Sequence, residues 1–178
     1  AFEAAGVQVD TEPVDTVASL ATRYIEAMRG IMDEKEMDKC ILAGWGFGGG
    51  IAHTMGQQLA ALGLSLKRIV IIDSQAPHRA GPLVPYDQVI QKFAMSLLPC
   101  DVVASGVAPV VRTSEVNTEL ALWKALHPLR EGKLLPSETS SADVWRSFCT
   151  FYAHIRAERG FVPLPLSLKM RVVEPRSR

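Results

Sequence analysis

Residues 39–50 read KCILAGWGFGGG, a short apolar segment that runs directly into a cluster of glycines. The apolar run 40–43 lacks polar alternation, which is typical of a strand buried on both faces of a parallel sheet. Residues 51–62 then place apolar side chains at helical spacing, and a second apolar run, 68–72, ends at Asp73. The stretch therefore predicts a strand, a tight turn, a helix and a second strand, the pattern of an α/β fold.

The chain on either side of this stretch is predicted to be mostly helical. Upstream, apolar residues recur at helical spacing over 17–31, and Asp15 is the expected N-cap. Downstream, helical periodicity covers 86–98, 114–126 and 142–158, separated by irregular stretches at 99–113 and 127–140. A strand-like run returns only at 168–173. We therefore expect an α/β body over 1–85, a helical insertion over 86–162 and a return to the body over 163–178.

Composition narrows the classes of protein that fit. The 178 residues are 48% hydrophobic, and 19 basic side chains balance 19 acidic ones, so we expect no nucleic acid or anionic membrane as a partner. Three cysteines without C-x-x-C spacing indicate neither a disulfide framework nor a zinc site, and we expect no metal. The sequence contains neither a membrane-length apolar run nor a signal-peptide pattern, so a cytoplasmic location is expected.

The glycine cluster has the frame of a nucleophile elbow, G-x-S-x-G, with Gly46 where the motif has serine. In that motif the central residue lies on a strained strand-to-helix turn that presents its oxygen beside backbone donors. Asp73 follows Gly46 by 73 − 46 = 27 positions, at the end of the next predicted strand. Because adjacent parallel strands place their carboxyl ends side by side, we expect Asp73 to lie next to the turn, where a triad acid belongs.

The same glycines allow a second interpretation. Gly44, Gly46 and Gly49 satisfy the dinucleotide fingerprint G-x-G-x-x-G, and Asp73 ends the next strand where a ribose-binding acid is expected. Against a Rossmann-type dinucleotide-binding domain stand Trp45 and Phe47, because bulky residues are awkward in a turn that must let a pyrophosphate approach the backbone. The pattern alone leaves both interpretations open.

The wider context resembles one family, the thioesterase domains that end nonribosomal peptide and polyketide synthetases and have the α/β-hydrolase fold. Residues 42–49, LAGWGFGG, differ from the family pattern L-x-G-W-S-F-G-G only at Gly46, and residues 18–29 resemble the helix that precedes this strand in the family. The resemblance implies a mostly parallel sheet with an inserted helical lid. It also implies that the N- and C-terminal parts of the fold, including an early oxyanion loop and the triad histidine, lie outside this sequence.

The resemblance carries specific functional expectations. It implies release of an acyl or peptidyl chain, by hydrolysis or cyclisation, from a thioester on the phosphopantetheine of a carrier protein, with no cofactor of the domain's own. Gly46 marks the nucleophile position, Asp73 the triad acid and the backbone N–H of Phe47 one oxyanion donor. Because glycine keeps the turn but has no oxygen, we expect a folded and hydrolytically inactive site, whether the residue is natural or engineered. A catalytically silent interaction module on the same fold is the remaining alternative.

Two further groups of side chains have weaker patterns. Aromatic residues in the predicted lid helices are candidates to line a substrate channel, although such spacing is more often that of core packing: Trp123, Trp145, Phe148 and Tyr152. The four histidines are expected to have structural rather than catalytic roles, because none has a position that suits a hydrolase triad: His53, His78, His127 and His154.

Overall fold

The computed structural model describes residues 6–7, 11–74, 84–98, 102, 118–166 and 169–174. The chain divides into two compact units. The first comprises residues 1–2, 14–81 and 153–178, and the second comprises residues 3–13 and 82–152. The division falls inside a long helix, α8 (Ser141–Gly160). The expected end of the helical insertion at residue 162 stays a prediction.

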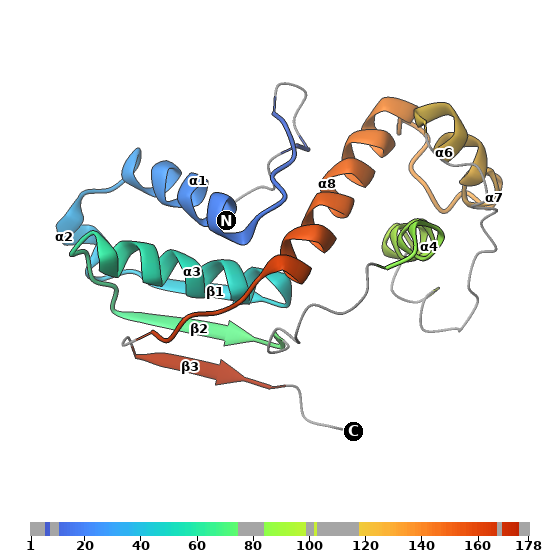
Figure 1. The fold of residues 1–178 in the computed structure, drawn as a ribbon. Helices are drawn as coiled ribbons and strands as arrows, with labels where there is room; N and C mark the ends of the chain where they lie inside the picture. Colours follow the sequence, from blue (N-terminus) through green and yellow to red (C-terminus); the bar gives the residue numbers. More distant parts are fainter. Residues whose placement is uncertain are drawn as a thin grey trace. The chain divides into compact units, whose positions relative to one another are not determined.

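The first unit is built on a parallel sheet. Its elements, in chain order, are α1 (Val17–Arg29), α2 (Glu34–Met37), β1 (Ile41–Trp45), α3 (Phe47–Ala61), β2 (Arg68–Ile72) and β3 (Met170–Val173). The described strands lie in the order β1-β2-β3, with both pairs parallel (Figure 1). Gly44 pairs with Ile71, and Ile71 with Val172. The predicted α/β pattern and parallel sheet are confirmed.

Two helices cover one side of this sheet. Helices α1 and α3 pack against each other, and α3 packs on β1 and β2 on the side that both helices occupy in Figure 1. Leu20 of α1, Leu59 of α3 and Ile69 of β2 are fully buried in the resulting core. Ile41 and Trp45, at the two ends of β1, are exposed. The burial of alternate strand residues fixes which side of the strands faces α3.

The start of α1 differs by one residue from the sequence prediction. Thr16, not Asp15, is the N-cap, and its hydroxyl oxygen accepts a hydrogen bond from the Ser19 N–H at 3.1 Å. The carboxylate of Asp15 instead forms an ion pair with Arg156 at 3.1 Å. Both residue types are good caps, so local sequence does not decide between neighbours when one of them has a distant partner.

The described part of the second unit is helical. It contains α4 (Tyr86–Ser96), α6 (Glu119–Ala125), α7 (His127–Glu131) and the first part of α8. The expectation of an irregular stretch over 127–140 is wrong at its start, because α7 begins at His127. Pro128 lies in the first turn of α7, where its missing N–H has no intrahelical acceptor to lose. The predicted irregular stretch at 99–113 lies, apart from Val102, outside the described residues.

An aromatic cluster forms the centre of the second unit. Phe148 of α8 is only 2% exposed, and its ring meets Tyr86 at 5.8 Å and Phe93 at 5.3 Å between centroids, both edge-on. Trp145 and Tyr152 also contact Phe148, at 5.7 and 6.3 Å. Edge-to-face ring pairs add about 0.5–1.5 kcal/mol each beyond the burial of their area. Side-chain contacts between α4 and α8 therefore hold this unit together.

Candidate functional site

The turn between β1 and α3 is formed by one residue. Gly46 is the N-cap of α3, with φ +53° and ψ −124°, a backbone conformation that residues with a Cβ adopt only under strain. A Cβ built on Gly46 meets no atom of the described residues within 4 Å. Within that part of the chain the position has room for a side chain, and the penalty for one is conformational.

The first glycine of the motif is required by close packing. A Cβ on Gly44 would overlap the carbonyl oxygen of Gly48 and the backbone N of Gly49, because the first turn of α3 folds back over the end of β1. Gly48 itself faces open space. The turn thus depends on Gly44 for packing and on Gly46 for backbone conformation.

Asp73 lies beside this turn, at the carboxyl end of β2. Its N–H donates to the Val173 carbonyl at 2.9 Å, and its carboxylate accepts a hydrogen bond from the indole N–H of Trp45 at 3.3 Å. The preceding residue, Ile72, accepts a hydrogen bond from the Gly46 N–H at 2.9 Å. Asp73 has φ +48°, so the chain turns sharply as it leaves the sheet. The structure brings Gly46 and Asp73 together, while the role of Asp73 as a triad acid stays a prediction.

Phe47 is the first residue of α3, and its backbone N–H belongs to the first turn, where a helix supplies no acceptor of its own. The partial positive charge of the helix N-terminus adds to the attraction of this N–H for an anion. The Phe47 ring packs against the imidazole of His154, with centroids 5.1 Å apart. The role of the Phe47 N–H as an oxyanion donor stays a prediction.

The described histidines occupy different environments. His53 on α3 is 9% exposed, and His154 on α8 is half-buried. Burial lowers the pKa of both imidazoles below the ordinary value, and one ring nitrogen of each is buried without a hydrogen-bond partner among the described residues. His127 is exposed and lies 3.5 Å from Glu131 on α7. His78 falls outside the described residues.

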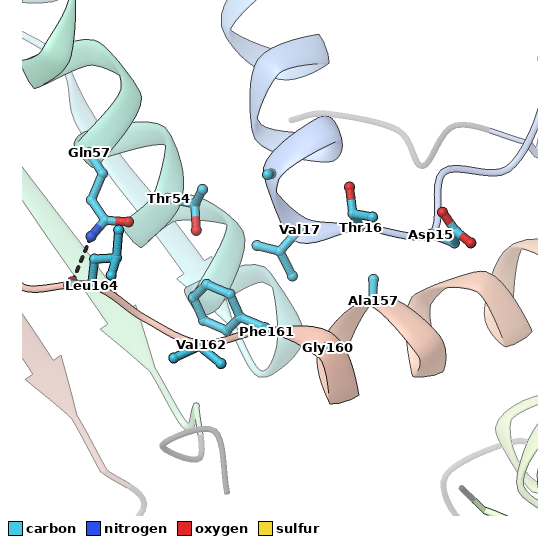
Figure 2. Close-up of a pocket in the computed structure, with 11 residues that line it drawn as sticks. Asp15, Thr16, Val17, Thr54, Gln57, Ala157, Gly160, Phe161, Val162 and Leu164 are labelled. Atoms are coloured by element: carbon cyan, nitrogen blue, oxygen red, sulfur yellow. Dashed lines mark hydrogen bonds between the residues drawn. The ribbon is translucent and has the colours of Figure 1, made fainter. Parts of the chain in front are cut away.

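A cavity of about 320 Å³ lies elsewhere in the first unit. Figure 2 shows the start of α1, Thr54 and Gln57 of α3, and the segment that follows α8 around this cavity. Gln57 donates a 2.6 Å hydrogen bond to the carbonyl of Leu164. The cavity and the turn at Gly46 are separate features, since neither Gly46 nor Asp73 is among the described residues that line it.

The four predicted channel residues lie in the second unit. Trp145, Phe148 and Tyr152 come together in its aromatic cluster. Trp123 instead lies under the Arg130 guanidinium, 4.0 Å from the ring centroid, a cation–π contact. Phe148 is thus a core residue, and channel lining stays a prediction for all four.

Ser74 is a contact of the turn to which the sequence analysis assigned no role. Its hydroxyl donates to the Gly46 carbonyl at 2.6 Å. The sequence signal that could have found it was its place directly after Asp73, just past the end of the strand next to β1.

Over the described ranges, no three His, Cys, Asp or Glu side chains form a group suited to a metal ion. Among the same residues, no helix has both the length and the apolar character needed to cross a membrane.

Comparisons with known proteins place this geometry in a family context. Residues 1–154 match the profile of the family described as Thioesterase domain. Polyketide synthase PksR of Bacillus subtilis is 36% identical over 79 residues, which are 44% of this chain and 3% of that protein. Thioesterase AMT4 of Alternaria alternata is 32% identical over 124 residues, covering 62% of this chain and 41% of that protein.

A solved structure shows the same fold. The crystal structure of holo-AB3403, a four-domain nonribosomal peptide synthetase bound to AMP and glycine, superposes with a TM-score of 0.78 at 23% sequence identity. The match covers 98% of this chain and 13% of that one. The matches thus cover less than half the length of each of these three proteins. RedJ, a thioesterase from the prodiginine biosynthetic pathway of Streptomyces coelicolor, superposes with a TM-score of 0.56 at 17% identity, over 96% of this chain and 57% of that one. The expected α/β-hydrolase-like fold is confirmed by such neighbours.

Proposed function

The chain belongs to the Thioesterase domain family, and on that premise we propose that its site receives an acyl or peptidyl thioester from a carrier protein. The substrate would arrive on the phosphopantetheine arm of that carrier. The observation that supports this proposal is the turn itself: Gly46 at φ +53° between β1 and α3, with Asp73 beside it at the end of β2.

The proposed reaction assigns a role to each element of the turn. A serine hydroxyl at position 46 would attack the thioester carbonyl, its proton would pass to a histidine, and the phosphopantetheine thiol would leave. The N–H of Phe47 would bind the developing oxyanion, and Asp73 would orient the histidine. Water or an internal nucleophile of the acyl chain would then attack the ester and release an acid or a macrocycle.

Gly46 removes the first step of this sequence. With no oxygen at residue 46, the acyl group has no site of covalent transfer, so we propose that the chain as it stands holds its substrate without releasing it. The same reasoning covers the alternative of a catalytically silent module. The two differ only in whether Gly46 is natural, and not in the chemistry at that residue.

The test is restoration of the missing oxygen by Gly46→Ser in the natural polypeptide that carries this chain, assayed with a carrier-bound acyl thioester. Gly63→Ser is the matched control, because Gly63 also has positive φ, at +76°, and no atom within 4 Å of a built Cβ. We expect acyl release from the first variant alone. If Gly46→Ser releases no more acyl chain than the control, the proposal fails.

The dinucleotide-binding alternative is not favoured by the comparisons. Close packing at Gly44 fits either kind of turn, so the glycines alone do not separate the two functions. The family match over residues 1–154 does, and it favours the thioesterase. Titration with NAD provides an independent check, for which the proposed function predicts no saturable binding in the micromolar range.

A further inference from the structure

The peptide that joins Gly46 to Phe47 accepts a hydrogen bond from a side chain that lies just after the end of β2. We propose that Ser74 is a positioning residue, whose hydroxyl fixes the plane of this peptide and so aims the Phe47 N–H at the oxyanion. The inference rests on the proposed function. The carrying observation is the 2.6 Å hydrogen bond from Ser74 Oγ to the carbonyl oxygen of Gly46.

The geometry of the peptide bond connects the two groups. The carbonyl of Gly46 and the N–H of Phe47 belong to one planar trans unit, in which the oxygen and the hydrogen point in opposite directions. Holding the oxygen therefore fixes the direction of the hydrogen. The same hydrogen bond polarises the amide, which makes its N–H a stronger donor.

Two backbone hydrogen bonds also act near the Gly46–Phe47 peptide, but neither connects it to the segment that carries Ser74. The Gly49 N–H also donates to the Gly46 carbonyl, at 3.0 Å, but that bond comes from within the first turn of α3 and moves with the helix. The Gly46 N–H donates to the Ile72 carbonyl at 2.9 Å, which fixes the peptide that precedes Gly46. Among the described residues, the Ser74 hydroxyl connects the following peptide to the segment that leaves β2.

The position of Ser74 is itself built into the fold. The positive φ of Asp73 turns the chain so that Ser74 lies under the start of α3. The Ser74 hydroxyl fits there because residue 49 is glycine: a Cβ on Gly49 would overlap Ser74 Oγ and approach Ser74 Cβ to 2.8 Å. The turn at Asp73 and the absence of a side chain at Gly49 therefore both allow the Ser74 hydroxyl to reach the Gly46 carbonyl.

Nuclear magnetic resonance can observe this peptide directly. The sequence contains two Gly–Phe pairs, Gly46–Phe47 and Gly160–Phe161. A chain labelled with ¹³C-carbonyl glycine and ¹⁵N-phenylalanine therefore gives two signals in a carbonyl–amide correlation spectrum. Gly46→Ser removes one of them and so assigns it, while the other is an internal control.

We expect Ser74→Ala to move the Gly46 carbonyl signal upfield, because the carbonyl loses a donor, and to move the Phe47 amide signal with it. The Gly160–Phe161 signal stays in place, and Ser74→Thr, which keeps the hydroxyl, stays close to the parent spectrum. If Ser74→Ala does not fold, Ser74→Cys, with its weak donor, should give a smaller shift of the same sign. An unchanged Gly46–Phe47 signal in the folded variant overturns the proposal.

Kinetics supply the second arm, in the Gly46→Ser background. There Ser74→Ala should lower kcat about tenfold with KM unchanged. This loss is smaller than the roughly 100-fold or greater loss that follows removal of an oxyanion donor itself. Ser74→Thr, which keeps the hydroxyl, should restore kcat. A higher KM with unchanged kcat contradicts a role at the oxyanion. If Gly46→Ser alone releases nothing, the proposed function fails, and the resonance arm still decides whether Ser74 holds the peptide.

Discussion

The two units of this chain are specified in different ways. In the first unit, the site depends on backbone: a positive φ at Gly46, a glycine packed against a helix start, and carbonyl and amide groups shared between β1, β2 and α3. In the second unit, helices are joined by large side chains centred on Phe148. Because the turn depends on backbone geometry, its shape does not require a side chain at residue 46.

The largest effect is expected in the second unit, where Phe148→Ala should remove about 3–5 kcal/mol of stability, because a fully buried ring leaves a cavity among its aromatic neighbours. Chemical denaturation followed by fluorescence measures the loss. Leu120→Ala, at a position 61% exposed on α6, is the control and should change stability by less than about 0.5 kcal/mol. If Phe148→Ala lowers stability by less than about 0.5 kcal/mol, as a surface substitution does, large side chains do not hold the second unit together.

In the first unit, Gly44→Ala should cost roughly 1–3 kcal/mol, because the new methyl group must displace backbone at the start of α3. Gly48→Ala, whose Cβ meets open space, should instead be neutral or stabilise α3 by up to about 1 kcal/mol. Equal effects at the two positions would show that close packing does not shape the turn. Thermal unfolding of the two variants side by side provides the measurement.

A smaller penalty is expected at the turn itself. Gly46→Ser should lower stability by about 1–2 kcal/mol, because a residue with a Cβ takes positive φ at that energy, while the side chain meets no atom. The expected outcome is a folded protein with a modestly lower urea midpoint. A loss larger than that of Phe148→Ala would mean that the turn does not tolerate the residue that its family pattern has there.

Acidification should give the smallest effect. Burial lowers the pKa of His53 and His154 below the ordinary 6.5, so the unfolded chain binds more protons than the folded one between the folded pKa and 6.5. The contribution of these neutral, buried imidazoles to the free energy of unfolding is fully present above pH 6.5. It is lost as the pH falls through the pKa that each imidazole has in the folded state. Urea midpoints at pH 7.5 and 5.5 should therefore differ less in His154→Gln than in the parent, and equal differences would contradict the assignment.

Sequence reasoning succeeded where a residue's place in the chain determines its place in the fold. The strands β1 and β2 followed from the apolar runs 40–43 and 68–72, and the neighbourhood of Gly46 and Asp73 followed from parallel pairing. It failed where two local choices were equally good, as at the cap of α1, and at residues 127–131, where α7 replaces the start of the expected irregular stretch. Ser74 was missed because its contact depends on the turn at Asp73 and on the space at Gly49.

The proposed function requires that the turn at residue 46 has the backbone geometry and the helix N-terminal charge of a nucleophile site, with glycine in place of the nucleophile. Gly46→Cys tests it most directly, since a thiol at a helix N-terminus has a lowered pKa and attacks thioesters as a thiolate. Gly63→Cys is the control, at the opposite end of α3. Peptide mass mapping after exposure to an acyl thioester should show that the cysteine at residue 46 is acylated at least about tenfold faster than the cysteine at residue 63. A tenfold difference corresponds to one unit of thiol pKa. Equal rates at the two positions would contradict the claim.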